Sequence, residues 1–321
     1  MNKNTGLERN FENNEIRSHV KLCTSRGNVN MAARGWSRIP MQTCNLSHHF
    51  LRKKKWNYWC ITGKDFLFSV TISDVDYAGL IFAYFIDYRT NEMIEKTITV
   101  PLARGIYMGD TVRSLCSFQN KDADVQFVTD ERGSSISMSW LNFYEGKDLC
   151  CELTLKIPQK HETLNVVVPW NDTDLFQFTS KQNALPAEGY FSLGEDKYEF
   201  KKDTAYGCLD FGRGIWPYSI SWNWGSFSAK VGADVVGLNM GAQWTDGTGI
   251  TENALCINGK LTKIKERILF IYDTNDFMKP WKIRTEDSSM IMLDFVPFFE
   301  RNAKSNFIII KSATHQMAFQ K

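Results

Sequence analysis

Apolar and polar residues alternate along most of this chain, which is the pattern of half-buried β-strands. The clearest example spans residues 65–73, where one face of the expected strand carries Phe66, Phe68, Val70 and Ile72. The unbroken apolar run from Tyr77 to Ile86 predicts a central strand buried on both faces. No long stretch repeats apolar residues every 3.6 positions, so we expect an all-β fold with few short helices.

Two hairpins are marked by their turn residues. Ser135–Phe143 and Leu149–Ile157 flank a short segment that contains Gly146. Ala254–Ile257 and Leu261–Ile264 flank Asn258-Gly259. Asn-Gly favours the positive φ angles of a two-residue hairpin turn, so the second hairpin carries the stronger local signal.

A turn-rich segment at residues 182–189 suggests a boundary between two strand-rich halves. We expect a polar lead-in at 1–33, an N-terminal barrel-like domain at 34–185 and a C-terminal one at 186–321. Residues 56–58 are similar to residues 222–224, so the two halves could be related by an internal duplication. The strand pattern at Asn306–Lys311 lies close to the last residue. This strand is therefore expected to be a poorly protected sheet edge, or the natural protein continues past Lys321.

Composition narrows the class of protein. The 321 residues are 43% hydrophobic and include ten Trp, while the net charge is only +2. This balance gives no electrostatic support for nucleic-acid binding. The N-terminus lacks a secretory pattern and no apolar run is long enough to span a bilayer, so we expect a cytoplasmic protein without a transmembrane segment. The eight Cys show no metal-ligand spacing and should be reduced.

The most informative stretch is residues 212–226, followed by residues 236–244. Both are expected to be strands of one hairpin, in which one face carries large side chains and the other carries small or polar ones. The large face comprises Trp216, Tyr218, Ile220, Trp222 and Trp224, continued by Val236, Leu238, Met240 and Trp244. The small face includes Ser221, Asn223, Asn239 and Gln243. Either face could line a ligand cavity.

The turn after Trp244 supplies two candidate acids, Asp246 and Glu252. A carboxyl group beside Trp rings has a raised pKa, because apolar surroundings disfavour its charged form. The alternative for Asp246 is a turn residue that bonds its own backbone. The candidate ligand-binding residues are Trp216, Tyr218, Trp222, Trp224, Asn239, Trp244 and Asn253. Asp210 and Arg213, which bracket a Gly-containing segment expected to be a turn, could form a salt bridge.

Several familiar sites are missing from the sequence. The five His form no paired-ligand pattern, and no nucleotide-binding glycine loop or serine-hydrolase elbow is present. We therefore expect no metal and no cofactor.

Several strings together resemble one known family. They are the segments 34–40, 55–60, 76–79, 210–218, 244–249, 251–253, 280–281 and 314–316. The chain from about Arg34 onward resembles the family called domain of unknown function 2804. The resemblance implies two tandem lipocalin-like β-barrels of the calycin type, distantly similar to carotenoid hydratases. This chain departs from the family pattern after Gln316, and the family supplies no established catalytic residue.

Three functions remain open from the sequence. The first is a binder of an apolar, lipid-like or isoprenoid-like small molecule that also acts as a cofactor-independent hydratase or isomerase. The second is a carrier or scaffold that uses the same cavity without catalysis. The third is a carbohydrate binder, since sugars also stack on Trp. A closed apolar cavity larger than roughly 300 Å³ favours the first two.

Overall fold

The computed structural model describes residues 10–307 and 310–319, with side chains described up to residue 301. Almost all of its regular structure is β-strand, and η1 (Met31–Ala33) is the only helical segment in the part of the chain described. The prediction of a nearly all-β fold is confirmed. Within the same residues, no helix is long and apolar enough to cross a membrane.

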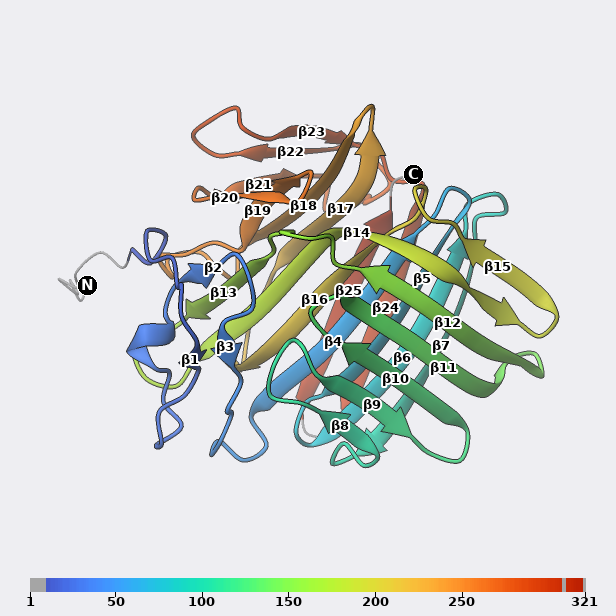
Figure 1. Cartoon of the computed structure of the whole chain (residues 1–321), viewed down its shortest axis with the longest axis horizontal. Coiled ribbons are helices and arrows are strands. Elements are labelled where there is room, and N and C mark those ends of the chain that lie inside the picture. The colour runs from blue at the N-terminus through green and yellow to red at the C-terminus, as the bar shows by residue number, and fades with distance from the viewer. Residues whose placement is uncertain (1–9, 308–309, 320–321) are drawn as a thin grey trace.

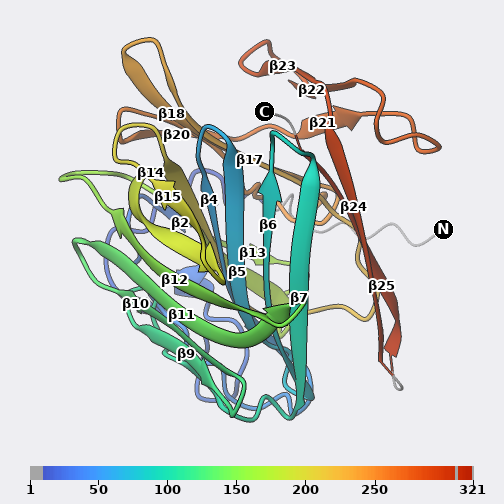
Figure 2. The same cartoon turned by 90° about the vertical axis from the view of Figure 1, so that its right-hand side faces the viewer.

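A 14-stranded sheet forms most of the body and curls into a half-barrel (Figures 1 and 2). Its main path runs β7 (Glu92–Pro101), β6 (Ala78–Asp87), β5 (Phe66–Asp74), β4 (Lys53–Thr62), β16 (Tyr206–Ile215), β14 (Phe176–Leu193), β12 (Lys147–Lys156), β11 (Gly133–Tyr144), β10 (Ala123–Thr129), β9 (Leu115–Gln119) and β8 (Ile106–Met108). Three strands join beside this path: β13 (Leu164–Pro169), β15 (Asp196–Phe200) and β2 (Trp36–Ser37).

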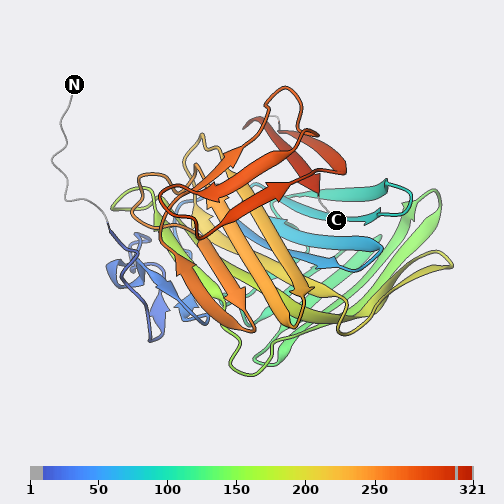
Figure 3. The same ribbon diagram turned by 90° about the horizontal axis from the view of Figure 1, so that it is seen from above.

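The later part of the chain forms smaller sheets over the outer face of the large one (Figure 3). The four-stranded sheet is β17 (Asn223–Val231), β18 (Asp234–Ala242), β19 (Asn253–Ile257) and β20 (Lys260–Ile264). A three-stranded sheet follows: β21 (Ile268–Ile271), β22 (Trp281–Thr285) and β23 (Met292–Phe295). Two pairs complete the fold: β1 (Val20–Lys21) with β3 (Gln42–Thr43), and β24 (Phe299–Phe307) with β25 (Ile310–Phe319).

The alternation read from the sequence accounts for the core of the half-barrel. Phe68, Val70 and Ile72 of β5 are fully buried inside it, as predicted. Strand β6 is buried on both faces, since Ile81 joins the inner core while Tyr84 joins a second cluster on the outer face. The expected central strand at residues 77–86 is therefore confirmed.

Both hairpins predicted from their turns are present. Strands β11 and β12 pair antiparallel around Gly146, and β19 pairs with β20 around Asn258-Gly259. Asn258 and Gly259 have φ angles of 50° and 78°, as a two-residue turn of this kind requires.

The segment expected to separate two domains lies inside β14. Residues 182–189 belong to this strand, whose register against β16 shifts between Gln182 and Leu185. Ala184 has a φ of 57°, which marks the irregularity. The turn-forming residues thus produce a bulge within a continuous strand, and the division at residue 185 stays a prediction.

The ends of the described chain pack against the body. Residues 10–33, expected as a polar lead-in, bury Leu22, Cys23 and Val29 in the main core. At the other end, β25 pairs with β24, and Arg301 of β24 forms an ion pair with Glu95 of β7 at 2.6 Å. The strand pattern at 306–311 includes residues 308 and 309, which lie outside the described part.

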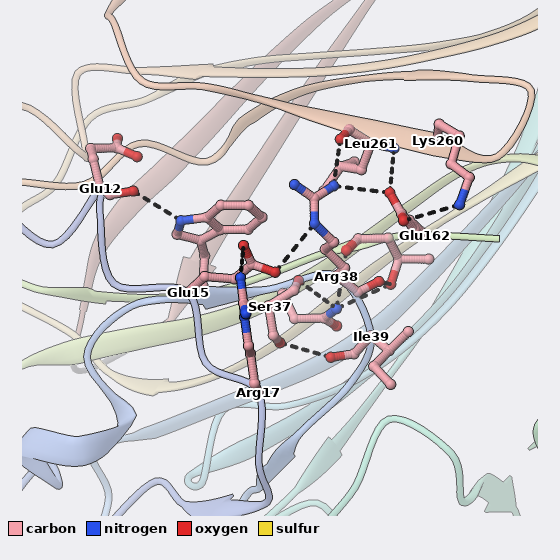
Figure 4. A network of polar contacts seen from close by, with 12 residues as sticks. Glu12, Glu15, Arg17, Ser37, Arg38, Ile39, Glu162, Lys260 and Leu261 are labelled. Carbon is pink, nitrogen blue, oxygen red and sulfur yellow. Dashed lines mark hydrogen bonds and ion pairs between the residues drawn. The ribbon is translucent and has the colours of Figure 1, made fainter. Parts of the chain in front are cut away.

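A polar network fastens the four-stranded sheet to the N-terminal segment (Figure 4). Arg38 reaches Glu15 at 3.2 Å and Glu162 at 2.9 Å. The carboxylate of Glu162 also accepts a hydrogen bond from the backbone N–H of Leu261 at 2.8 Å. Because these contacts join distant parts of the sequence, they fix where the four-stranded sheet sits.

Candidate functional site

Three outward-facing side chains form a row across the centre of the large sheet. Asp210 of β16 lies directly opposite Lys181 of β14 on one side and Tyr58 of β4 on the other. Lys181 Nζ is 2.8 Å from Asp210 Oδ2, and the Tyr58 hydroxyl shares a 2.9 Å hydrogen bond with the Tyr84 hydroxyl. A row of polar groups thus lies on the sheet face that the later strands cover.

Glu252, which immediately precedes β19, completes this group from the opposite layer. Its Oε2 lies 3.1 Å from Lys181 Nζ, and its Oε1 accepts a 2.6 Å hydrogen bond from the Trp244 indole. The carboxyl group fits against β18 only because residue 241 is Gly, since a Cβ there would lie 1.9 Å from Glu252 Oε1. Lys181, Asp210 and Glu252 are called the charge cluster below.

The charge cluster holds two carboxyl groups for one ammonium group. Burial lowers the pKa of Lys181, but Asp210 and Glu252 outweigh it, so the pKa stays above its usual value and Lys181 is charged. Burial raises the pKa of Glu252, and repulsion from Asp210 adds to this increase, so the pKa stays raised although Lys181 and the Trp244 hydrogen bond lower it. Asp210 keeps 16% of its side chain exposed, against 2% for Glu252. The cluster has one carboxyl group more than it has ammonium groups, so one carboxyl group can carry a proton. Glu252 is the better candidate, because it is the more deeply buried of the two.

Aromatic rings surround the charge cluster. Lys181 Nζ lies 5.0 Å from the centre of the Trp224 ring, and this ring meets Tyr58 edge to face at 6.0 Å. A second chain of Trp rings, with centroids 5.4–5.9 Å apart, reaches the charge cluster through the hydrogen bond from Trp244 to Glu252. It is called the Trp cluster: Trp56, Trp170, Trp216, Trp222 and Trp244. All these rings keep part of their surface exposed.

The structure gathers four of the other predicted site residues around Glu252: Trp224, Asn239, Trp244 and Asn253. Asn239 accepts a 2.9 Å hydrogen bond from the Trp224 indole and donates one to the Glu252 carbonyl. Asn253 accepts a 2.7 Å hydrogen bond from Gly241 N–H and is fully buried. These two amides therefore hold β17, β18 and the Glu252 segment together.

Trp216 and Trp222 belong to the Trp cluster, and two other predicted site residues lie apart from both groups. Asp246 is exposed in its turn and pairs with Arg267 at 2.9 Å. Tyr218 is 92% exposed, and its ring stacks under the Arg52 guanidinium at 4.1 Å. Neither side chain touches the charge cluster by any contact that the structure records in its described part.

The prediction of one bulky and one small wall is wrong. Residues 216–222 form a loop rather than a strand, since β16 ends at Ile215 and β17 begins at Asn223. Across the hairpin, Trp224 pairs with Gly241, so even positions of β17 share a face with odd positions of β18. Trp224 therefore lies over the small face. Gln243 has a φ of 70° and turns Trp244 away from the face of Met240.

The expected Asp210–Arg213 salt bridge is also wrong. Both residues lie in β16, and positions three apart in a strand point to opposite faces. Asp210 points outward to Lys181, whereas Arg213 points into the half-barrel core. There its guanidinium donates to the backbone oxygens of Trp56 and Gly212 and to Asn57 Oδ1.

Sequence reasoning missed Lys181, Tyr58, Trp56 and Trp170. Lys181 stands beside the segment that was interpreted as a linker, so it was not recognised as part of a buried strand. The available signal was its spacing from Gln177 and Thr179, which places three polar residues on one face of a strand that buries Phe176 and Phe178 on the other.

An open groove of about 570 Å³ occurs elsewhere in the molecule. It lies near the ends of β10, β11 and β12 and is lined by residues that include Val128, Arg132, Leu155 and Pro158. None of its lining residues belongs to the charge cluster or the Trp cluster. The groove and the buried charged groups therefore lie in different parts of the molecule.

Comparison with known proteins identifies the family. A family described as a domain of unknown function (DUF2804) matches residues 13–318. The chain belongs to this family. No curated protein matches it in sequence.

Solved structures with similar folds show low sequence identity to this DUF2804 protein. An AttH-type protein of Nitrosomonas europaea is 10% identical, covers 85% of this chain and 90% of its own, and has a TM-score of 0.47. CghA, solved with Sch210972, is 10% identical over 82% and 81% of the two chains, also at 0.47. Kievitone hydratase from Nectria haematococca is 9% identical over 74% of both chains, at 0.41.

Proposed function

We propose that this protein binds an apolar small molecule, lipid-like or isoprenoid-like, against the Trp rings beside the charge cluster. In this proposal it hydrates or isomerises the ligand without a cofactor, and Glu252 is the general acid. The observation that carries the proposal is the enclosed Glu252 carboxyl group, which has a raised pKa and lies between the Trp244 indole and Lys181.

The chemistry of an alkene explains why these groups belong together. Adding a proton to a carbon–carbon double bond requires an acid that is still protonated near neutral pH. Burial and the charge of Asp210 raise the pKa of Glu252, which favours its protonated form. The carbocation that forms is stabilised by the faces of nearby Trp rings. Asp210, whose carboxylate remains partly exposed, can then accept a proton from the ligand or from water.

The ring geometry favours an apolar ligand over a sugar. The Trp56–Trp216, Trp170–Trp216 and Trp216–Trp222 pairs meet edge to face, at interplanar angles of 89°, 74° and 76°. A sugar-binding platform presents a flat ring face to solvent, whereas in these pairs the edge of one ring meets the face of the next. Rings at such angles form walls of different orientation rather than one flat platform, and this suits an apolar molecule better than a sugar.

Replacing Trp224 tests the binding part of the proposal. We expect Trp224→Ala to bind farnesol or oleic acid at least tenfold more weakly than the wild type, measured by native mass spectrometry with a panel of apolar and sugar ligands. The ring is only half-buried, so the fold should survive. The control is Tyr107→Ala, which removes an exposed ring on β8.

Two results would contradict this expectation. One is unchanged binding by Trp224→Ala. The other is a loss of stability of the ~3–5 kcal/mol typical of a core aromatic, which would assign Trp224 to the core instead. Selective binding of sugars by the wild type would favour the carbohydrate alternative.

A further inference from the structure

Two cysteines lie one step along the sheet from the charge cluster. Cys208 precedes Asp210 by two positions on β16, and Cys60 follows Tyr58 by two positions on β4, so all four share the outer face. Cys60 is 7% exposed and Cys208 8%, both within the same hydrophobic cluster. The proposed function makes no use of either thiol.

The two cysteines are placed to bond with each other. They are direct partners in the register of β4 against β16. Opposite residues in an antiparallel pair have Cα atoms about 4.5–5.5 Å apart, and disulfides span Cα distances of about 4.4–6.8 Å. The Cα spacing typical of this pairing therefore falls within the range that a disulfide spans. Cys150 and Cys151, by contrast, are neighbours on one strand, with one exposed and one buried.

The two thiols differ in their surroundings. The Cys60 thiol bonds toward the Cys208 sulfur, which lowers the pKa of Cys208 and raises that of Cys60. Burial and the negative charge of Asp210 disfavour the Cys208 thiolate, whereas Ser226 of β17 and the positive charge of Lys181 favour it, and the pKa of Cys208 remains lowered. Ser226 is itself held by the side-chain amide of Asn183 at 2.8 Å.

We propose that Cys60 and Cys208 form a dithiol that reduces small hydroperoxides and becomes a disulfide in doing so. The Cys208 thiolate attacks the terminal oxygen of the hydroperoxide, the O–O bond breaks, and an alcohol or water leaves with one added proton. The product at Cys208 is a sulfenic acid. The Cys60 sulfur then attacks Cys208, so the S–S bond forms and water leaves. Two molecules of a low-molecular-weight thiol restore the dithiol.

Limited oxidation of the reduced wild-type protein tests this proposal. The protein receives an equimolar amount of hydrogen peroxide, its remaining thiols are blocked with N-ethylmaleimide, and its peptides are analysed by mass spectrometry. We expect a Cys60–Cys208 linked peptide to form before Cys150 is oxidised, although Cys150 is the exposed cysteine. Labelling of Cys60 and Cys208 by N-ethylmaleimide after Cys150 has reacted would overturn the proposal.

Single substitutions assign the order of attack. Cys60→Ser should accumulate a sulfenic acid at Cys208 that dimedone traps, whereas Cys208→Ser should give no dimedone adduct at Cys60. The reverse pattern would overturn the assigned roles. Should either variant fail to fold, the linked peptide of the wild type still decides the proposal. No ligand is needed, so the outcome is independent of the proposed hydration chemistry.

Discussion

Replacing Lys181 with Met is expected to lower the free energy of unfolding by ~3–5 kcal/mol, measured by urea denaturation. The Lys181 ammonium is the positive charge that faces both Asp210, at 2.8 Å, and Glu252, at 3.1 Å. Without it, two carboxyl groups remain enclosed in the same space without their common partner. Removing one member of a buried ion pair costs far more than removing a surface charge, because the remaining charge is poorly solvated.

A surface pair provides the matched control for this substitution. Lys197 contacts Glu199 at 2.9 Å, but both side chains are about half exposed. Lys197→Met should therefore cost less than about 1 kcal/mol. Combining Lys181→Met with Asp210→Asn and Glu252→Gln should recover most of the lost stability, since no buried charge is then left unpaired. If Lys181→Met and Lys197→Met lowered the free energy of unfolding by the same amount, the charge cluster would not contribute to stability as described.

Replacing Gly241 with Ala is expected to displace the Glu252 carboxyl group. The added methyl group would lie 1.9 Å from Glu252 Oε1 and 2.4 Å from its Cδ. Displacing the carboxyl group is costly in free energy, because Trp244 and Lys181 hold it in a buried position. We expect a loss of ~1–3 kcal/mol in stability, as in other overpacked cores, and the loss of any activity that depends on Glu252.

Gly225 offers the control for the added methyl group. It lies on β17, and its new Cβ would meet the flexible end of Met240 at 3.0 Å. Gly225→Ala should therefore cost clearly less than Gly241→Ala and should leave Glu252 in place. Similar stability and similar activity of the two variants would show that the close approach at Gly241 is unimportant.

Local patterns predicted the parts of this fold that depend on neighbouring residues. The alternation at residues 66–72 gave the correct buried face of β5, and Asn258-Gly259 gave the correct turn, because both are decided within a few residues. The pairing of β17 with β18 is different. Whether Trp224 lies over Gly241 or Met240 depends on the register between the strands, which the composition of each strand alone does not determine.

The charge cluster was only partly predictable for a related reason. Glu252 was chosen from its nearness to Trp244, and Asn239 from its small-residue strand. Lys181 was missed because Pro186 and Gly189 made its surroundings resemble a linker, whereas β14 absorbs them through a bulge. Asp210 was noticed but given the wrong partner, since its neighbour across the sheet is distant in sequence.

Transfer of deuterium from solvent to ligand tests the central claim, that Glu252 protonates an apolar ligand, most directly. Farnesol is incubated with the protein in D₂O, and carbon-bound deuterium in farnesol and its products is measured by mass spectrometry. We expect incorporation by the wild type that falls as the pH rises through the raised pKa of Glu252, because the acid form is then lost. Glu252→Gln should abolish incorporation, whereas Asp246→Asn should retain it. Equal incorporation by Glu252→Gln and the wild type, or loss in Asp246→Asn alone, would contradict the account.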